Sequence, residues 1–290
     1  MANPIITHKY TADPTVIVVN DVVYLYTGHD NPPDGIDDYV MNEWLCFSSP
    51  DLVQWTEHPV PLRPEFFSWA KGDAYASKVI QHNNKYYWFV ATTPRGHGGK
   101  AIGVAIATSP LGPFKDACGS ALIDSSMISK PDSDNFDPSV LIDNGEAYIF
   151  WGKHTCFYAK LSSDLTSIEG EIKIVSLPDF EEGIHIHKHQ EWYYLSYGYG
   201  YPEKVAYAMS KSIHGPWEFK GILNELAGNC ITNRPAIIDF KEQSYFFYHN
   251  GGLKNGGSHR RSVCIDYLYY NDDRTIKRIV MTSEGVKSVL

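Results

Sequence analysis

The sequence predicts an all-β protein, a five-bladed β-propeller with four-stranded antiparallel blades. Three observations support this prediction. A pattern of strand, turn, aromatic-rich strand and third strand occurs five times along the 290 residues. The repeats are about 45 to 65 residues long, which suits four-stranded blades joined by loops of variable length. Almost no segment has the 3.6-residue periodicity of an amphipathic helix, so strands must supply the core.

The first and third repeats share the clearest pattern. Residues 13–15 read Asp-Pro-Thr and residues 137–139 read Asp-Pro-Ser, and an apolar strand follows each. Asn20-Asp21 interrupts the first repeat, and Asp143-Asn144-Gly145 interrupts the third before an aromatic strand. Asn-Gly between two apolar runs favours a tight hairpin, because both residues tolerate positive φ.

The innermost strand of each propeller blade lines the central channel. The residues that open the first strand of each repeat should therefore meet at one mouth of that channel. These residues are Asp13, Asp73, Asp137, Glu182 and Arg234.

Composition excludes several classes of function. The formal net charge is −9, whereas nucleic acids and anionic membranes attract basic surfaces. No apolar run is long enough to cross a bilayer. The five cysteines form no C-x-x-C pair, so neither zinc nor a disulfide framework is indicated. We expect a monomer with no nucleic-acid partner and no membrane span.

Converging carboxyl groups suit the hydrolysis of a glycosidic bond, in which one acid protonates the leaving oxygen and another activates water. Asp13 is placed to be the general base, and Glu182, with its longer side chain, the general acid. Asp137 would raise the pKa of Glu182 and orient it. Taken singly, such acids are more often solvated turn residues, but their matching positions in the repeats favour a shared site.

Aromatic and basic residues near the same mouth suggest a sugar pocket. Trp69, Tyr75 and Phe136 are candidates to stack on the apolar face of a sugar. Arg261 is a candidate to bind sugar hydroxyl groups, with an exposed loop cation as the alternative. A further set of tryptophans is expected to pack between blades: Trp88, Trp151, Trp192 and Trp217.

His185, His187 and His189 alternate and would share one face of a strand, where an i/i+2 pair can bind a metal. No cysteine or acidic cluster accompanies them at ligand spacing, so we expect no metal site there. His185 follows Glu182 closely and is a candidate to face the sugar pocket.

Several motifs resemble those of glycoside hydrolase family 43, five-bladed propeller enzymes that act on arabinose- and xylose-containing polysaccharides. Ala12-Asp13-Pro14 resembles the general-base motif, and Phe136-Asp137-Pro138-Ser139 that of the pKa-modulating aspartate. Glu181-Glu182-Gly183 resembles the general-acid motif. The resemblance covers essentially the whole chain and implies single displacement with inversion of configuration.

The sequence departs from the family pattern in two places. Ile184 and His185 stand where relatives usually have proline and an aromatic residue. Arg234 stands where they often have a histidine, which in many members is associated with a calcium or other ion in the channel. Arg234 would either replace that ion or pair with Asp137. We therefore expect that no cofactor is required.

The resulting prediction is a single catalytic domain over residues 1–290 that releases α-L-arabinofuranosyl or β-D-xylosyl units from xylan-type polysaccharides. An endo-1,4-β-xylanase or arabinanase is the alternative enzyme, and a sugar-binding propeller with impaired catalysis is the alternative of another class. No carbohydrate-binding module is expected, because the chain ends just after the fifth repeat. The compartment stays open: periplasmic or extracellular if a leader was removed, cytoplasmic otherwise.

Overall fold

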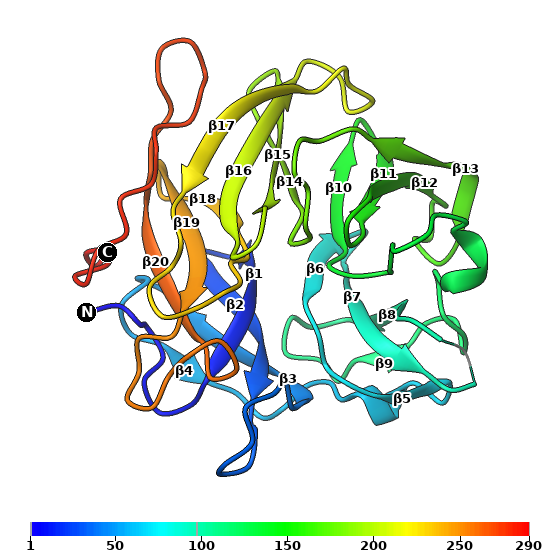
Figure 1. The fold of residues 1–290 in the computed structure, drawn as a ribbon, viewed down its shortest axis with the longest axis horizontal. Helices are drawn as coiled ribbons and strands as arrows, with labels where there is room; N and C mark the ends of the chain where they lie inside the picture. Colours follow the sequence, from blue (N-terminus) through cyan, green and yellow to red (C-terminus); the bar gives the residue numbers. More distant parts are fainter. Residues whose placement is uncertain (1, 97, 290) are drawn as a thin grey trace.

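The computed structural model describes residues 2–96 and 98–289, and its strands form five antiparallel sheets arranged in a ring (Figure 1). Blade 1 contains β1 (Thr11–Val19), β2 (Val22–Asp30), β3 (Met41–Ser49) and β4 (Thr56–Glu57). Blade 2 contains β6 (Ser77–His82), β7 (Lys85–Pro94), β8 (Ala101–Ala107) and β9 (Lys115–Asp116), with β5 (Ala70–Gly72) paired to the end of β7. Blade 3 contains β10 (Ser139–Asp143), β11 (Glu146–Trp151), β12 (Cys156–Leu161) and β13 (Ile168–Val175). Blade 4 contains β14 (His185–His189), β15 (Trp192–Tyr199), β16 (Lys204–Ser210) and β17 (Glu218–Asn224), and blade 5 contains β18 (Ala236–Phe240), β19 (Gln243–Asn250) and β20 (Ser262–Leu268).

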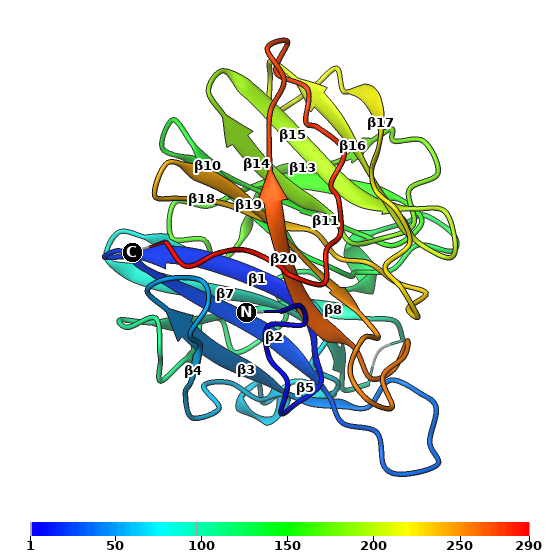
Figure 2. The ribbon, with the colours of Figure 1, turned by 90° about the vertical axis from the view of Figure 1, so that its left-hand side faces the viewer.

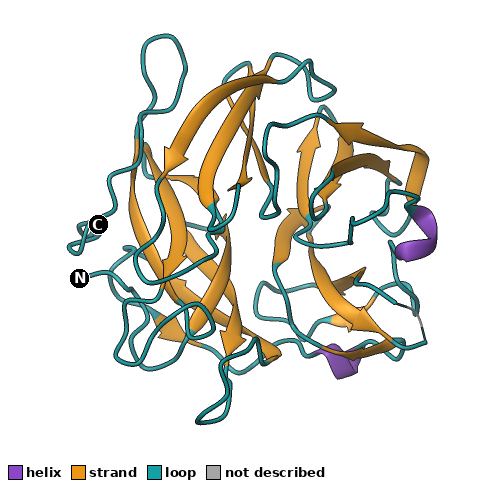
Figure 3. Ribbon diagram, viewed as in Figure 1, coloured by secondary structure: helices purple, strands orange, loops and turns teal. Residues whose placement is uncertain are grey.

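The prediction of an all-β five-bladed propeller is confirmed. The inner strands β1, β6, β10, β14 and β18 surround the centre, and each contacts the next around the ring (Figure 1). Within the described ranges, two single-turn 3-10 helices, Pro64–Phe66 and Ser125–Met127, accompany the strands (Figure 3). None of the described helical segments is long and apolar enough to cross a membrane.

The two ends of the chain meet at blade 5, which has three strands in its sheet. The N–H of Ile5 donates to the carbonyl of Val263 in β20 at 2.9 Å, and the N–H of Asn3 donates to the carbonyl of Ser283 at 2.9 Å. Figures 1 and 2 both place the two termini close together beside this blade. The N-terminal segment therefore closes the ring between blades 5 and 1.

Hydrophobic packing between neighbouring blades forms the core. The described residues make five apolar clusters, each between two adjacent blades. Trp88 and Trp151 are fully buried in two of them, and Trp192 and Trp217 pack against two others, as the sequence predicts. Burial of such large side chains is the main favourable contribution to folding.

Polar side chains of the inner strands join one blade to the next. Thr15 Oγ1 accepts from the N–H of Val79 at 3.3 Å, and Ser139 Oγ accepts from the N–H of Ile186 at 3.1 Å. In blade 4 the equivalent link comes from His185, whose Nε2 accepts from the N–H of Ile237 at 3.2 Å. These bonds hold the inner strands in register, so the residues just before each strand are fixed in space.

Candidate active site

The backbone bends sharply where the candidate acids enter the inner strands. Asp13 and Pro14 lie at a bulge in β1, where the pairing with β2 shifts register. Asp13 has a φ of 53° and Asp137, which precedes β10, a φ of 56°. A positive φ is uncommon for residues other than glycine. Bulges and such conformations turn a side chain out of the regular strand alternation, here toward the channel mouth.

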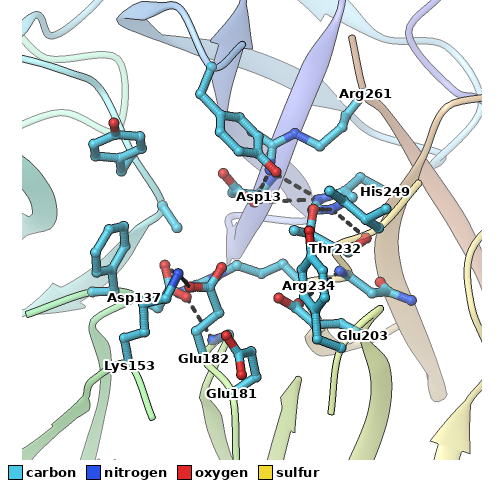
Figure 4. A pocket seen from close by; sticks show the side chains of 18 of the residues that line it. Asp13, Asp137, Lys153, Glu181, Glu182, Glu203, Thr232, Arg234, His249 and Arg261 are labelled. Carbon is cyan, nitrogen blue, oxygen red and sulfur yellow. Dashed lines mark hydrogen bonds and ion pairs between the residues drawn. The ribbon is translucent and has the colours of Figure 1, made fainter. Parts of the chain in front are cut away.

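These side chains line a cavity of about 380 Å³ at that mouth (Figure 4). Its acidic, basic and aromatic lining residues include Asp13, Asp137, Glu181, Glu182, Glu203, Lys153, Arg234, His249, Arg261, Tyr39, Tyr75, Phe136 and Tyr201. The structure thus brings together Asp13, Asp137, Glu182 and Arg234 from four different blades, as the repeat pattern predicts.

Asp13 is held from two sides. Arg261 Nη1 donates to Asp13 Oδ1 at 3.0 Å, while the rest of the guanidinium forms two bonds of 2.8 and 2.9 Å with the carboxylate of Asp30. The N–H of Asp13 donates to Nδ1 of His249 at 3.2 Å, and His249 Nε2 lies 3.1 Å from the carbonyl of Thr232. The ring proton of His249 is therefore on Nε2, and burial lowers its pKa well below the usual value. Asp13 consequently has a fixed position and a compensated charge.

Asp137 is almost completely buried and lies between a cation and a backbone donor. Arg234 Nη1 lies 2.6 Å from Asp137 Oδ1, and the N–H of Gly183 donates to Oδ2 at 2.6 Å. Burial raises the pKa of Asp137, and Asp13 adds to this effect, whereas Arg234 and Gly183 oppose it. Because Gly183 follows Glu182 directly, this hydrogen bond also fixes the backbone that carries Glu182.

Glu182 has the electrostatics of a proton donor. Burial and the neighbouring Asp137 carboxylate raise its pKa to about 7, although Lys153 lowers it. Lys153 Nζ lies 3.1 Å from Glu182 Oε2. A carboxyl group with a pKa near neutrality retains a proton at the pH where it must donate one.

Two of the aromatic candidates and both arginines line the cavity. The rings of Tyr75 and Phe136 lie side by side, with centroids 5.5 Å apart. Arg261 is only 4% exposed, so the alternative of an exposed loop cation is wrong. The structure places Arg261 against Asp13 and Arg234 against Asp137, which makes both arginines partners of the acids.

Trp69, His185 and Asp73 do not line this cavity. Trp69 packs against Phe67 and donates its indole N–H to Asp116 at 3.1 Å. His185 lies within β14, where it serves the link between blades and faces the channel beyond the site. Asp73 accepts from Thr93 and pairs with Lys100 at 3.3 Å. His185 therefore belongs to the regular part of β14, and the hydrogen bonds of Trp69 and Asp73 hold their side chains away from the cavity.

Several residues that line the cavity are not predicted by the sequence repeats, among them Lys153, Glu203 and Tyr39. Lys153 follows β11, Glu203 precedes β16, and Tyr39 lies in the loop after β2. All three lie outside the inner strands on which the repeat argument is based. His249 is the next-to-last residue of the aromatic strand β19, which is also not an inner strand.

The site does not fit a metal ion. Among the described residues, no group of three or more His, Cys, Asp and Glu side chains is arranged to hold one. Arg234 already neutralises Asp137, and Arg261 pairs with Asp13 at 3.0 Å. Two fixed cations with few free oxygen ligands disfavour a bound divalent cation.

A propeller that gathers two buried acids and a half-buried one beside aromatic side chains in one cavity has the features of an enzyme that cleaves glycosidic bonds. The chain belongs to glycosyl hydrolases family 43, whose family model matches residues 1–276.

Curated relatives and solved structures agree with this assignment. An arabinoxylan arabinofuranohydrolase of Bacillus subtilis (strain 168) is 28% identical over 99% of this chain and 66% of its own length. A second such protein, from Paenibacillus polymyxa, is matched over 52% of its length, so the chain spans about half to two thirds of these relatives. The structure of an α-L-arabinofuranosidase from Clostridium thermocellum is 31% identical, with 98% of each chain covered and a TM-score of 0.81. A β-xylosidase/α-arabinofuranosidase from a compost microbial metagenome is 26% identical, with 96% of this chain and 97% of that chain covered and a TM-score of 0.86.

Proposed function

We propose that this protein is an inverting, exo-acting glycosidase that removes α-L-arabinofuranosyl or β-D-xylosyl units from arabinoxylan, xylan or their oligosaccharides. The observation that carries the proposal is the contrast between two acids in one cavity. Asp13 is paired with a fixed guanidinium, whereas burial raises the pKa of Glu182 to about 7. Environments that differ in this way assign one carboxyl group as base and the other as acid.

The reaction follows from these two environments. Glu182 gives its proton to the glycosidic oxygen as the bond to the anomeric carbon breaks. A water molecule attacks that carbon from the opposite face, and Asp13 takes the proton that the water loses. Asp137 stays paired with Arg234 and fixes the Glu182 backbone through Gly183. Inversion requires the Asp13 and Glu182 carboxyl groups to be about 6.5–9.5 Å apart, so that water fits between substrate and base.

The substrate proposal draws on the relatives and on the shape of the site. The relatives are named as arabinoxylan arabinofuranohydrolases and as xylosidase/arabinosidases. Here the Tyr75 and Phe136 rings flank the cavity on one side, and Tyr39 and Tyr201 also contribute to its lining. A cavity of about 380 Å³ bounded by aromatic residues suits one terminal pentose better than a long chain.

The test is sugar release from wheat-type arabinoxylan, linear xylan and arabinan by the wild-type protein and the Glu182→Gln variant. Arabinose or xylose from the wild type, with a loss of about 10²- to 10⁴-fold in the variant, is expected. Proton NMR of the first-formed anomer should show inversion. Long oligosaccharide products would indicate the endo-acting alternative. Binding of oligosaccharides without release would indicate a sugar-binding propeller.

We further propose that catalysis requires no metal or other cofactor and that the active species is a monomer. Arg234 supports the first point, because its guanidinium supplies the positive charge beside Asp137. Activity and melting temperature should be unchanged by EDTA or by millimolar Ca²⁺ in the wild type. Calcium-dependent stabilisation of the wild type would overturn this. Arg234→His is the informative comparison, since it removes the fixed cation.

A further inference from the structure

Of the five carboxyl groups that line the cavity, those of Glu181 and Glu203 have no role in the proposed mechanism, and Glu203 is the more deeply buried of the two. Glu203 is the last residue before β16 and is 2% exposed. Its Oε2 accepts a hydrogen bond from the N–H of Asn233 at 3.0 Å. Within the described residues its Oε1 has no hydrogen-bond partner, and the side chain lines the cavity near Glu182 (Figure 4).

Glu203 differs from the three candidate catalytic acids because it lacks a cation. Each of the other acids has one: Arg261 for Asp13, Arg234 for Asp137 and Lys153 for Glu182. No Lys, Arg or His side chain in the described ranges forms an ion pair with Glu203. A buried carboxylate without a compensating cation is costly, so the group retains its proton. Burial and the nearby Glu182 raise the pKa of Glu203 well above its usual value.

The backbone around Glu203 leaves space for this side chain. A Cβ at Gly198 would lie 2.9 Å from Glu203 Oε2 and 3.1 Å from the carbonyl oxygen of Glu182. Only glycine allows β15 to pass this close to both groups. The N–H of Glu203 also donates to the carbonyl of Ile231 at 2.9 Å. Glu203 is therefore fixed by hydrogen bonds of both its backbone and its side chain.

We propose that Glu203 is a substrate-binding residue whose neutral carboxyl group donates a hydrogen bond from Oε1 to a hydroxyl group of the sugar bound beside Glu182. Since Oε2 accepts the Asn233 N–H, the proton belongs on Oε1, the oxygen that is left to reach the cavity that Glu203 lines. A neutral donor orients the sugar without adding negative charge next to the proton donor Glu182. This inference rests on the proposed function, because it requires a sugar in this cavity.

The test compares Glu203→Gln and Glu203→Met on the aryl pentoside that the wild type hydrolyses, 4-nitrophenyl α-L-arabinofuranoside or β-D-xyloside. In Glu203→Gln the amide oxygen can accept the Asn233 N–H while the NH₂ group replaces the O–H donor. Its kcat/KM should stay within a few-fold of wild type. Glu203→Met has similar size but no donor, and its kcat/KM should fall about 10- to 100-fold. Glu218→Gln, an exposed glutamate on β17 of the same blade, is the control.

A series of monodeoxy pentosides separates binding from structure. With wild type, loss of the hydroxyl group that Glu203 contacts should lower kcat/KM about 10-fold or more, and with Glu203→Met the same loss should have little effect. A destabilised fold would instead lower kcat/KM for every substrate in the series by the same factor. Equal sensitivity of both proteins to every deoxy position would overturn the proposal.

The pH profile of Glu203→Gln provides a second readout that does not depend on the Met variant folding. Because Glu203 is neutral, its amide variant should keep the alkaline limb of the kcat/KM profile in place. A shift of that limb to lower pH would mean that Glu203 carries a charge beside Glu182, and would overturn the proposal. If the wild type hydrolyses neither pentoside, the proposed function is wrong, but the role of Glu203 in sugar binding can still be tested. Calorimetry with xylose and arabinose then tests Glu203, and equal affinities of wild type and Glu203→Met would refute its role.

Discussion

The two ends of the central channel are built from the same five inner strands but differ in their charge arrangement. At the mouth, the three candidate catalytic acids each face a cation: Arg261, Arg234 and Lys153. Farther along the channel, Lys78, His185 and His187 lie among apolar residues such as Ile17, Ile80 and Val140. No described carboxylate forms an ion pair with Lys78.

The difference shows which features make one end of a regular propeller channel reactive. Burial lowers the pKa of His187 to about 3 and that of Lys78 to about 8, so desolvation dominates in the interior of the channel. At the mouth, positive-φ residues such as Asp13 and Asp137 turn carboxyl groups inward, and fixed cations compensate them. The reactive groups are therefore concentrated at this mouth of the channel, and the regular parts of the inner strands hold them in place.

The largest expected effect is a loss of activity on substitution at the mouth of the channel but not at its other end. Asp13→Asn should lower kcat/KM by about 10²- to 10⁴-fold, because the amide cannot take a proton from the attacking water. His187→Asn, at the other end, should leave kcat/KM within about two-fold, since it touches no substrate. Both are measured on the same aryl pentoside, with circular dichroism to confirm folding. Near-normal activity of Asp13→Asn would remove Asp13 from the mechanism.

The next prediction contrasts two aromatic residues that sequence reasoning treats alike. Phe136→Ala should raise KM roughly 3- to 10-fold by removing a face for sugar stacking. Trp69→Phe should leave KM unchanged and lower the melting temperature, because it loses the hydrogen bond to Asp116. A raised KM in Trp69→Phe would show that this side chain reaches the sugar after all.

The sequence predicts the ring and the three acids because both follow from a repeat. Asp13 and Asp137 occupy the same place in the matching first and third repeats, and Glu182 occupies that place in the fourth repeat. The position of His185 could not be obtained in this way. The positive-φ glycine at 183 ends the entry turn, and His185 is already within β14, where its side chain bonds to blade 5.

The remaining lining residues were unpredictable for another reason. Lys153 and Glu203 come from loops after the second strand of their blades. How far such loops reach over the channel depends on packing between blades, which no local pattern encodes. Trp69 shows the converse, since its loop position suggested a sugar platform and the structure places the ring against Phe67.

A third prediction tests the pairing of acids and cations at the mouth. Lys153 favours the ionised form of Glu182, so Lys153→Met should raise the pKa of Glu182 above its value of about 7. The general acid must be protonated, and the alkaline limb of kcat/KM should therefore move to higher pH by about one unit. Lys160→Met, which removes a lysine paired with Glu146 on the same blade, is the control and should leave the limb in place. An unmoved limb in Lys153→Met would mean that Glu182 is not the group that titrates.

The smallest expected effect concerns stability at the far end of the channel. Burial lowers the pKa of Lys78 to about 8, whereas a lysine in the unfolded chain has a pKa near 10.4. Below pH 8 the side chain is charged in both states, so the full free-energy cost of burying the charge is present. That cost fades as pH rises from about 8 to about 10.4, because the folded protein then loses the proton first. Lys78→Met should therefore raise the free energy of unfolding at pH 7 by about 1 kcal/mol, a figure reduced for the partial solvent exposure of the side chain. The gain should shrink in urea titrations near pH 10, while kcat/KM stays unchanged. A loss of stability in Lys78→Met would show that the ammonium group has a favourable partner. Charged side chains would then be paired at both ends of the channel, and the contrast between the two ends would fail.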